Sequence, residues 1–183
     1  MKKRTIIGSG VAAFVAAGAI GLGAYGVAGG EEAETIEAVP VADVADADVS
    51  QSSSLTQEAV LDVLDAAVAE AEKQDQRVTV AVVDRDGNTV GLIKMNGAGP
   101  QSEQSAQQKA YTAVAWNNNT SELSKNLKGN GPNIDDIPGT LFLPGGAPAA
   151  FDGVPVAGVG VAGAPDGMID EAIAEAGLAA LDD

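Results

Sequence analysis

The spacing of apolar residues predicts a helix at the start of the folded region. Between Thr56 and Lys73 the apolar residues recur three or four positions apart: Val60, Leu64, Ala67, Val68 and Ala71. This spacing places them on one face of an amphipathic helix. Thr56 is a good N-cap for this helix, and Leu55 can pack on Val60 across the cap.

A β-hairpin is predicted next, because the apolar period changes from helical to alternating. In residues 78–82 valine occupies every second position, which is the pattern of a strand. Asp86-Gly87 is a turn signal, and residues 89–95 return as the second strand. After a break at residues 96–100, the segment from Gln101 to Trp116 has a helical pattern again.

The second half of the chain consists of short predicted elements joined by glycine-rich turns. Thr120 is predicted to cap a short helix with Glu122 in its first turn, and residues 129–139 form a polar loop. Three short strands follow over residues 140–143, 147–151 and 154–161, and Asp166-Gly167 precedes a final helix over residues 168–181. The order α-β-β-α-α-β-β-β-α predicts an α+β fold, a five-stranded antiparallel sheet with helices packed on it.

The predicted helix over residues 101–116 has two unlike faces. One is a narrow stripe of small residues that lets the helix lie close to the sheet: Ala106, Ala110, Ala113 and Val114. The other face carries Ser105, Gln108, Lys109, Thr112 and Trp116, and Tyr111 lies between the two. The second face is either a solvated surface or, because it holds the only tryptophan of the chain, a ligand or partner site.

The first 28 residues have the organisation of an export signal. Lys2, Lys3 and Arg4 precede an uncharged stretch rich in Ala, Gly, Val and Ile, and residues 26–28 have the small-x-small form of a cleavage site. The alternative is a retained membrane anchor, because the apolar stretch reaches the length of about 20 residues that spans a bilayer. We therefore expect a secreted or extracellular protein, either released or anchored by its N-terminal segment.

Residues 29–54 are predicted to be a disordered acidic linker, which leaves residues 55–183 as the folded domain. Residues 31–54 contain seven carboxylates and no basic or aromatic residue, so this segment cannot bury enough apolar surface to offset its ordering entropy. The whole chain has a net charge of −16. Without Lys2, Lys3 and Arg4, 7 basic residues remain against 26 acidic ones, a net charge of −19. Such a charge argues against nucleic acid or an anionic membrane surface as a partner.

The absence of histidine and cysteine restricts the chemistry of the chain. No Ser/His/Asp or Cys/His set exists, and the carboxylates and lysines form no recognisable acid/base constellation, so the residues give no support for an enzyme. Of the side chains that bind haem iron, the exported chain offers only Met95, Met168 and Tyr111. Methionine is more often a packing residue, and a tyrosine at a core boundary is more often a hydrogen-bonded structural residue.

Six segments carry a family resemblance: AVVDRDGNT, GAGPQS, KAYTAVAW, TSEL, DIPGTLFLPGG and PVAGVGVAGAP, in family order over most of residues 55–181. The chain thereby resembles the GlcG/HbpS family, also called the haem-degrading domain, which includes a secreted haem-binding protein. The resemblance implies a profilin-like or PAS-like sheet and a homo-oligomer such as an octamer. It also links the threonine of the K-A-aromatic-T-A motif, here Thr112, to haem. Histidines implicated in iron binding in the family have no counterpart here, so the metal ligand is unknown.

We predict from these observations an exported haem-binding protein. Its candidate cofactor site comprises Thr112, Lys109, Trp116, Tyr111 and Gln108, with Thr112 positioning or weakly contacting the haem and Lys109 pairing with a propionate. The resemblance further implies an accessory role beside a membrane sensor kinase in redox or haem signalling. Two alternatives stay open. One is a haem-degrading or peroxidase-like activity, and the other is a non-catalytic oligomeric module whose interaction surface is the Trp116 face.

Overall fold

The computed structural model describes residues 45–49, 52–127 and 133–181. The predicted export signal, residues 1–28, lies outside the described residues, as does most of the predicted linker over residues 29–54. The described linker residues include a 3-10 turn, Asp46–Asp48, without a buried side chain. None of the helices in the described ranges is long and apolar enough to cross a membrane.

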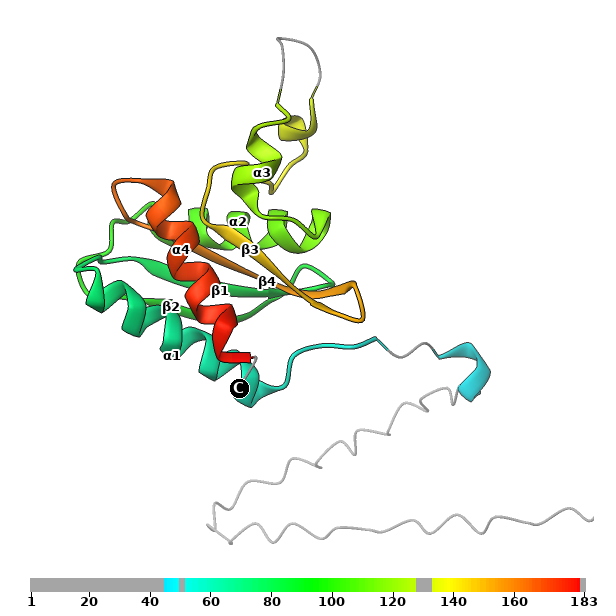
Figure 1. Cartoon of the computed structure of the whole chain (residues 1–183). Coiled ribbons are helices and arrows are strands. Elements are labelled where there is room, and N and C mark those ends of the chain that lie inside the picture. Colours follow the sequence, from blue (N-terminus) through cyan, green and yellow to red (C-terminus); the bar gives the residue numbers. More distant parts are fainter. Residues whose placement is uncertain (1–44, 50–51, 128–132, 182–183) are drawn as a thin grey trace, which may run out of the picture. The chain divides into compact units, whose positions relative to one another are not determined.

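In the described residues, four α-helices and four strands form the domain (Figure 1). In chain order they are α1 (Gln57–Lys73), β1 (Thr79–Asp84), β2 (Thr89–Lys94), α2 (Ser102–Trp116), α3 (Thr120–Ser124), β3 (Gly146–Phe151), β4 (Val154–Ala162) and α4 (Gly167–Leu178). The strands form one antiparallel sheet in the order β2-β1-β4-β3. The predicted α+β class is confirmed.

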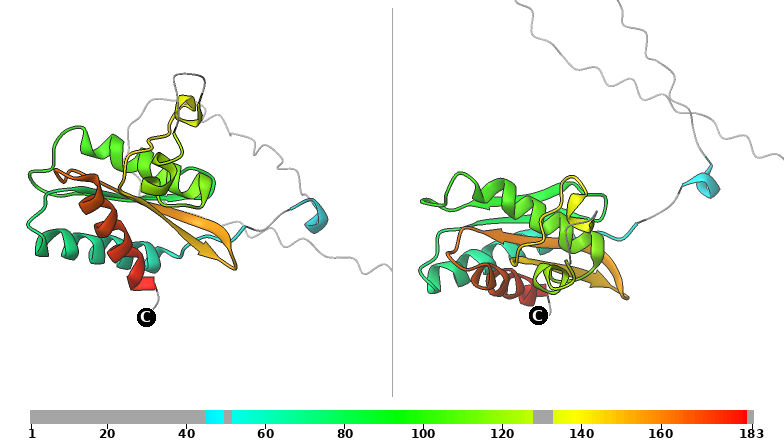
Figure 2. Two further views of the ribbon diagram at one scale, coloured as in Figure 1. Left: turned by 45° about the horizontal axis from the view of Figure 1, so that its top comes forward. Right: turned by 90° about the horizontal axis from the view of Figure 1, so that it is seen from above.

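The sheet lies between two helical layers (Figure 2). Helices α1 and α4 pack on one face, and α2 packs on the other. Strand β1 is buried on both faces: Val80 and Val82 join the core under α1 and α4, while Ala81 and Val83 meet α2. Successive side chains of a strand point to opposite faces of a sheet, so β1 contributes buried residues to the cores on both faces.

Helix α2 lies directly on the backbone of β4. The predicted stripe of small residues is confirmed, because all four of its members are buried. The strand contributes glycines at the same contact. A Cβ atom at Gly158 would be 2.2 Å from the Ala110 carbonyl oxygen, and one at Gly160 would be 2.0 Å from the Ala106 carbonyl oxygen. The small side chains on both elements thus allow a close approach of helix and strand.

The predicted hairpin between β1 and β2 is confirmed, and Asp84 organises its turn. The Asp84 carboxylate accepts hydrogen bonds from the backbone N–H groups of Asp86 and Asn88, at 2.9 Å and 2.8 Å. Partial burial opposes ionisation of Asp84, but these hydrogen bonds outweigh it and lower the pKa of the carboxyl group. Gly87 takes a positive φ of 88° in the turn, a conformation that favours glycine.

The predicted fifth strand, residues 140–143, is wrong. The four-stranded sheet contains no pairing to this segment, and its backbone is used elsewhere. The Leu141 N–H donates to the Thr112 hydroxyl of α2 at 2.8 Å, and Phe142 is buried. A short apolar run of this kind is compatible with a strand or with packing against a helix, and the contact with α2 decides between them.

The predicted N-cap at Thr120 is also wrong. Asn119 holds the cap position of α3, and Thr120 is the first helical residue. The Thr120 hydroxyl instead accepts a hydrogen bond from the Gly146 N–H at 2.8 Å and faces Glu171 of α4. In contrast, Thr56 caps α1 as predicted, because its hydroxyl accepts from the Ala59 N–H at 3.2 Å.

Candidate functional site

The face of α2 that carries Thr112 is covered by residues 140–146, named here the covering segment. Thr112 is fully buried. Its hydroxyl donates to the Gln108 carbonyl at 2.7 Å and accepts from the Leu141 N–H at 2.8 Å. One turn further along α2, the Trp116 ring meets the Phe142 ring edge-on, with 5.2 Å between centroids and 71° between planes. Thr112 and Trp116 therefore hold the covering segment in this chain.

Lys109 forms an internal ion pair beneath the same segment. Its ammonium donates to Asp170 Oδ2 of α4 and to the Val161 carbonyl of β4, both at 2.9 Å. The two charged side chains are only 5% and 4% exposed. Burial raises the pKa of Asp170, and the Lys109 ammonium opposes that rise. The alternative of a solvated face is therefore wrong for both Lys109 and Thr112.

The close approach of the covering segment to this ion pair requires a glycine. Gly145 has a φ of 128°, and a Cβ atom there would be 2.6 Å from the Lys109 ammonium and 2.9 Å from Asp170 Cβ. Its backbone carbonyl accepts from the Val161 N–H at 2.8 Å. The Lys109–Asp170 pair thus joins α2, β4 and α4 under the Pro144-Gly145-Gly146 turn.

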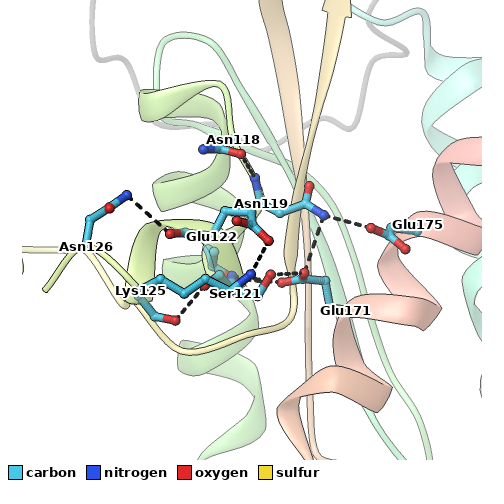
Figure 3. Close-up of polar contacts among 10 residues, drawn as sticks. Asn118, Asn119, Ser121, Glu122, Lys125, Asn126, Glu171 and Glu175 are labelled. Atoms are coloured by element: carbon cyan, nitrogen blue, oxygen red, sulfur yellow. Dashed lines mark hydrogen bonds and ion pairs between the residues drawn. The ribbon is translucent and has the colours of Figure 1, made fainter.

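A second buried carboxylate, Glu171, was not predicted from the sequence. It reaches from α4 to the start of α3, where it accepts from the Ser121 hydroxyl and from the Ser121 N–H, the latter at 3.0 Å (Figure 3). It also accepts from the Gly145 N–H at 3.1 Å. Asn119 donates to both Glu171 and Glu175, at 3.4 Å and 2.7 Å. These donors satisfy Glu171, and no lysine or arginine of the described residues pairs with it.

One sequence signal for these acids exists. Asp170 lies at helical spacing from two apolar residues of α4, Ile173 and Ala174, which are fully buried. A carboxylate on the apolar stripe of a helix needs a partner when it is buried. Glu171, which follows Asp170 directly, has no comparable signal.

Tyr111 and Gln108 face a different region, beside the hairpin turn. They line a cavity of about 210 Å³ together with Val83, Gln107 and Gly139. Tyr111 as a whole is 37% exposed. A Cβ atom at Gly87 would be 3.0 Å from Tyr111 Cε2, so one edge of the ring lies against the turn. Of the five predicted site residues, the structure brings only Tyr111 and Gln108 to one cavity.

Other hollows lie on the described part of the domain, and one of about 420 Å³ is lined by Arg85, Phe151 and Val154. A groove of about 720 Å³ runs beside β3 and the ends of α1 and α4, and its lining includes Leu55, Phe151 and Leu178 but none of the predicted site residues. A smaller cavity of about 260 Å³ contains Lys109 and Asp170. Within the described ranges, no group of three or more acidic side chains is placed to hold a metal ion.

We predict that Thr112→Val lowers the free energy of unfolding by about 1–3 kcal/mol, because the partly buried Leu141 N–H loses its acceptor. Thr112→Ser keeps the hydroxyl and should cost less. Urea unfolding of both variants measures the difference. Equal losses for Val and Ser would show that the hydroxyl does not hold the covering segment.

Comparison with known proteins decides the family. The family described as "Haem degrading protein HbpS-like" matches residues 55–179. The chain belongs to the HbpS-like family. Among solved structures, this HbpS-like chain is similar to a double mutant of Streptomyces reticuli HbpS, with 54% identity and a TM-score of 0.73 over 79% of this chain and 98% of the other.

More distant relatives agree with this assignment. The HbpS-like chain is 27% identical to PduOC, solved in complex with haem, with a TM-score of 0.65 over 70% of this chain and 95% of the other. It is 29% identical over 107 residues to protein GlcG of Escherichia coli strain K12, covering 58% of this chain and 80% of GlcG. The resemblance stated from the sequence motifs is therefore confirmed.

Proposed function

We propose that this protein binds haem at the surface formed by Tyr111 and Gln108 of α2 and the β1–β2 turn. The observation that carries the proposal is an exposed phenol beside a cavity on α2, in a chain of the HbpS-like family. PduOC, a relative at 27% identity, was solved with haem bound. The same helix contains the KAYTAVAW motif that indicated haem from the sequence.

The side chains at this surface fit haem in their chemistry. Haem iron is bound in proteins by His, Cys, Met or Tyr, and this chain contains no His or Cys. Tyr111 provides the required donor type at a solvent-accessible position. The aromatic ring of Tyr111 provides apolar contact, and Gln107 and Gln108 provide amides that can orient a polar edge.

The cavity is too small to enclose haem by itself, and this supports a site of which one chain forms only one wall. Pockets that enclose small-molecule ligands have volumes of about 300–1,000 Å³, and this cavity has about 210 Å³. We propose that a second copy of the chain covers the exposed side of the haem. This arrangement agrees with the homo-oligomer that the sequence resemblance implies, and light scattering with and without haem tests it.

The cellular role that we propose follows from the N-terminal sequence and the family resemblance. Residues 1–28 would direct export, and the domain would act outside the cytoplasm as an accessory of a membrane sensor kinase in haem or redox signalling. Cell fractionation, together with N-terminal sequencing of the mature protein, tests the first part. Co-purification with a sensor ectodomain, with and without haem, tests the second.

A titration with ferric haem tests the function itself. We expect a saturable shift of the Soret band, and Gln108→Leu should weaken binding. Gln57→Leu, the same substitution at an exposed position of α1, is the matched control and should bind normally. A flat titration of the unmodified protein would remove the proposal. Loss of the Soret band with iron release under reductant would show degradation of haem.

A further inference from the structure

The phenol of Tyr111 is held in place while its hydroxyl is left available. One ring edge lies against Gly87 of the β1–β2 turn, where an added Cβ atom would be 3.0 Å from Tyr111 Cε2 and 3.4 Å from Cδ2. The residue is nevertheless 37% exposed. In residues 52–127 and 133–181, the Tyr111 hydroxyl takes part in no hydrogen bond, although a buried tyrosine hydroxyl usually has a partner. The interpretation of Tyr111 as a hydrogen-bonded structural residue is therefore wrong within the described part of the chain.

The other two iron-ligand candidates in the described residues are less suitable. Met95 packs against the core between the sheet, α1 and α4, so its thioether would have to leave that core to reach an iron. Met168 is 53% exposed in the first turn of α4, but α4 packs on the sheet face opposite to α2. Of the residues that the structure describes, Tyr111 alone combines a suitable donor atom, exposure and a cavity on α2.

We propose that the Tyr111 hydroxyl oxygen is the protein's ligand to ferric haem iron. This inference rests on the proposed function and adds the identity of the iron ligand. The phenol loses its proton to solvent, the resulting phenolate forms a bond to ferric iron, and water leaves the iron, so no electron is transferred. A phenolate is one of the protein ligands known for haem iron, and it needs no histidine.

The location of Tyr111 also gives Thr112 a different role from the one predicted. The Thr112 hydroxyl is buried with a donor and an acceptor already in place. Because Tyr111 and Thr112 are adjacent on α2, the contact between Thr112 and the covering segment fixes the position of the helix turn that presents Tyr111. Thr112 is thus a positioning residue, and Tyr111 is the group that contacts the iron.

The deciding experiment compares single variants of the full chain in complex with ferric haem. Tyr111→Phe keeps the ring and removes only the hydroxyl. We expect it to abolish the phenolate vibrations that resonance Raman spectroscopy detects in the unmodified complex. We also expect it to weaken haem binding by about 10- to 100-fold or more, because loss of an outer-shell partner already lowers the affinity of a metal site by this factor.

Three matched variants control for other ligands. Tyr25→Phe replaces the only other tyrosine, and Met95→Leu and Met168→Leu replace the two thioethers that follow the initiator Met1; all three should keep the spectrum of the unmodified complex. An unchanged spectrum in Tyr111→Phe would overturn the ligand assignment while leaving the haem-binding function intact. The ligand assignment is equally overturned if one of the control variants abolishes the phenolate vibrations or if the unmodified complex lacks them. A flat titration of the unmodified protein would instead refute the proposed function.

Discussion

Gly160→Ala is expected to lower the free energy of unfolding by about 3 kcal/mol or more, at the upper end of the range for overpacking a core. The added Cβ atom would lie 2.0 Å from the Ala106 carbonyl oxygen and 2.5 Å from the Ala110 N atom. Both atoms belong to the backbone of α2, so the clash cannot be relieved by a change of rotamer. Helix α2 would have to move away from β4 along its closest contact with the sheet.

Gly99→Ala is the matched control for this prediction. A Cβ atom at Gly99 would be 2.6 Å from Gln101 Oε1, which is the end of an exposed and flexible side chain that can move away. We expect the control to stay within about 0.5 kcal/mol of the unmodified protein, as surface substitutions usually do. Urea unfolding followed by circular dichroism gives both values. A loss for Gly160→Ala no larger than that of the control would contradict the close packing of α2 on β4.

Lys109→Met is expected to be the second severely destabilising substitution, with a loss of about 3–5 kcal/mol at neutral pH. The methionine preserves much of the aliphatic volume but leaves the Asp170 carboxylate buried without its cation. Lys73→Met is the matched control, because Lys73 pairs with Glu70 on the surface of α1. Removal of that exposed pair should leave the free energy of unfolding nearly unchanged.

The pH dependence of the Lys109→Met variant provides a distinct test. Burial already raises the pKa of Asp170 above its ordinary value of 3.8, and Lys109 opposes this rise; without the lysine, the pKa should rise further. Between the two pKa values the folded state binds a proton at Asp170 that the unfolded state has released. Asp170 therefore contributes stability that is fully present below pH 3.8 and is lost as the pH rises through the raised pKa of the folded state. The destabilisation by Lys109→Met should therefore be smaller at about pH 4 than at about pH 7.

The double variant Lys109→Met, Asp170→Leu separates the unpaired charge from lost packing. Replacement of both partners by apolar residues removes the buried charge, and such replacements are often neutral or stabilising. We expect the double variant to recover most of the stability that Lys109→Met loses. A double variant as unstable as the single one, together with a loss that does not change with pH, would show that the ion pair is not the cause.

The regular elements were predictable because each depends on residues that are close in sequence. The apolar spacing of residues 60–71 and the Asp86-Gly87 turn led to α1 and the β1–β2 hairpin, as the structure confirms. The stripe of small residues on α2 also predicted close packing on the sheet. The same reasoning gave a wrong strand at residues 140–143, because four apolar or β-branched residues are equally compatible with a strand and with a segment packed on a helix.

The candidate site was predictable in its helix but not in its arrangement. The sequence motifs indicated α2 and the HbpS-like family, and the family is confirmed. A helical wheel placed Lys109 and Thr112 on a surface beside Trp116, but it contains no information about segments distant in the sequence. The covering segment approaches from about 30 positions further along the chain and buries both residues.

The sequence by itself determined the α+β class, the two faces of α2 and the family, because these depend on local periodicity and on contiguous motifs. Only the tertiary structure decided the number of strands, the partners of Asp170 and Glu171, and which predicted site residues stay accessible. Each of these depends on which buried polar groups form hydrogen bonds or ion pairs between segments that are distant in the sequence. The Leu141 N–H could have paired with a strand, but it pairs with Thr112, and Tyr111 is left facing solvent.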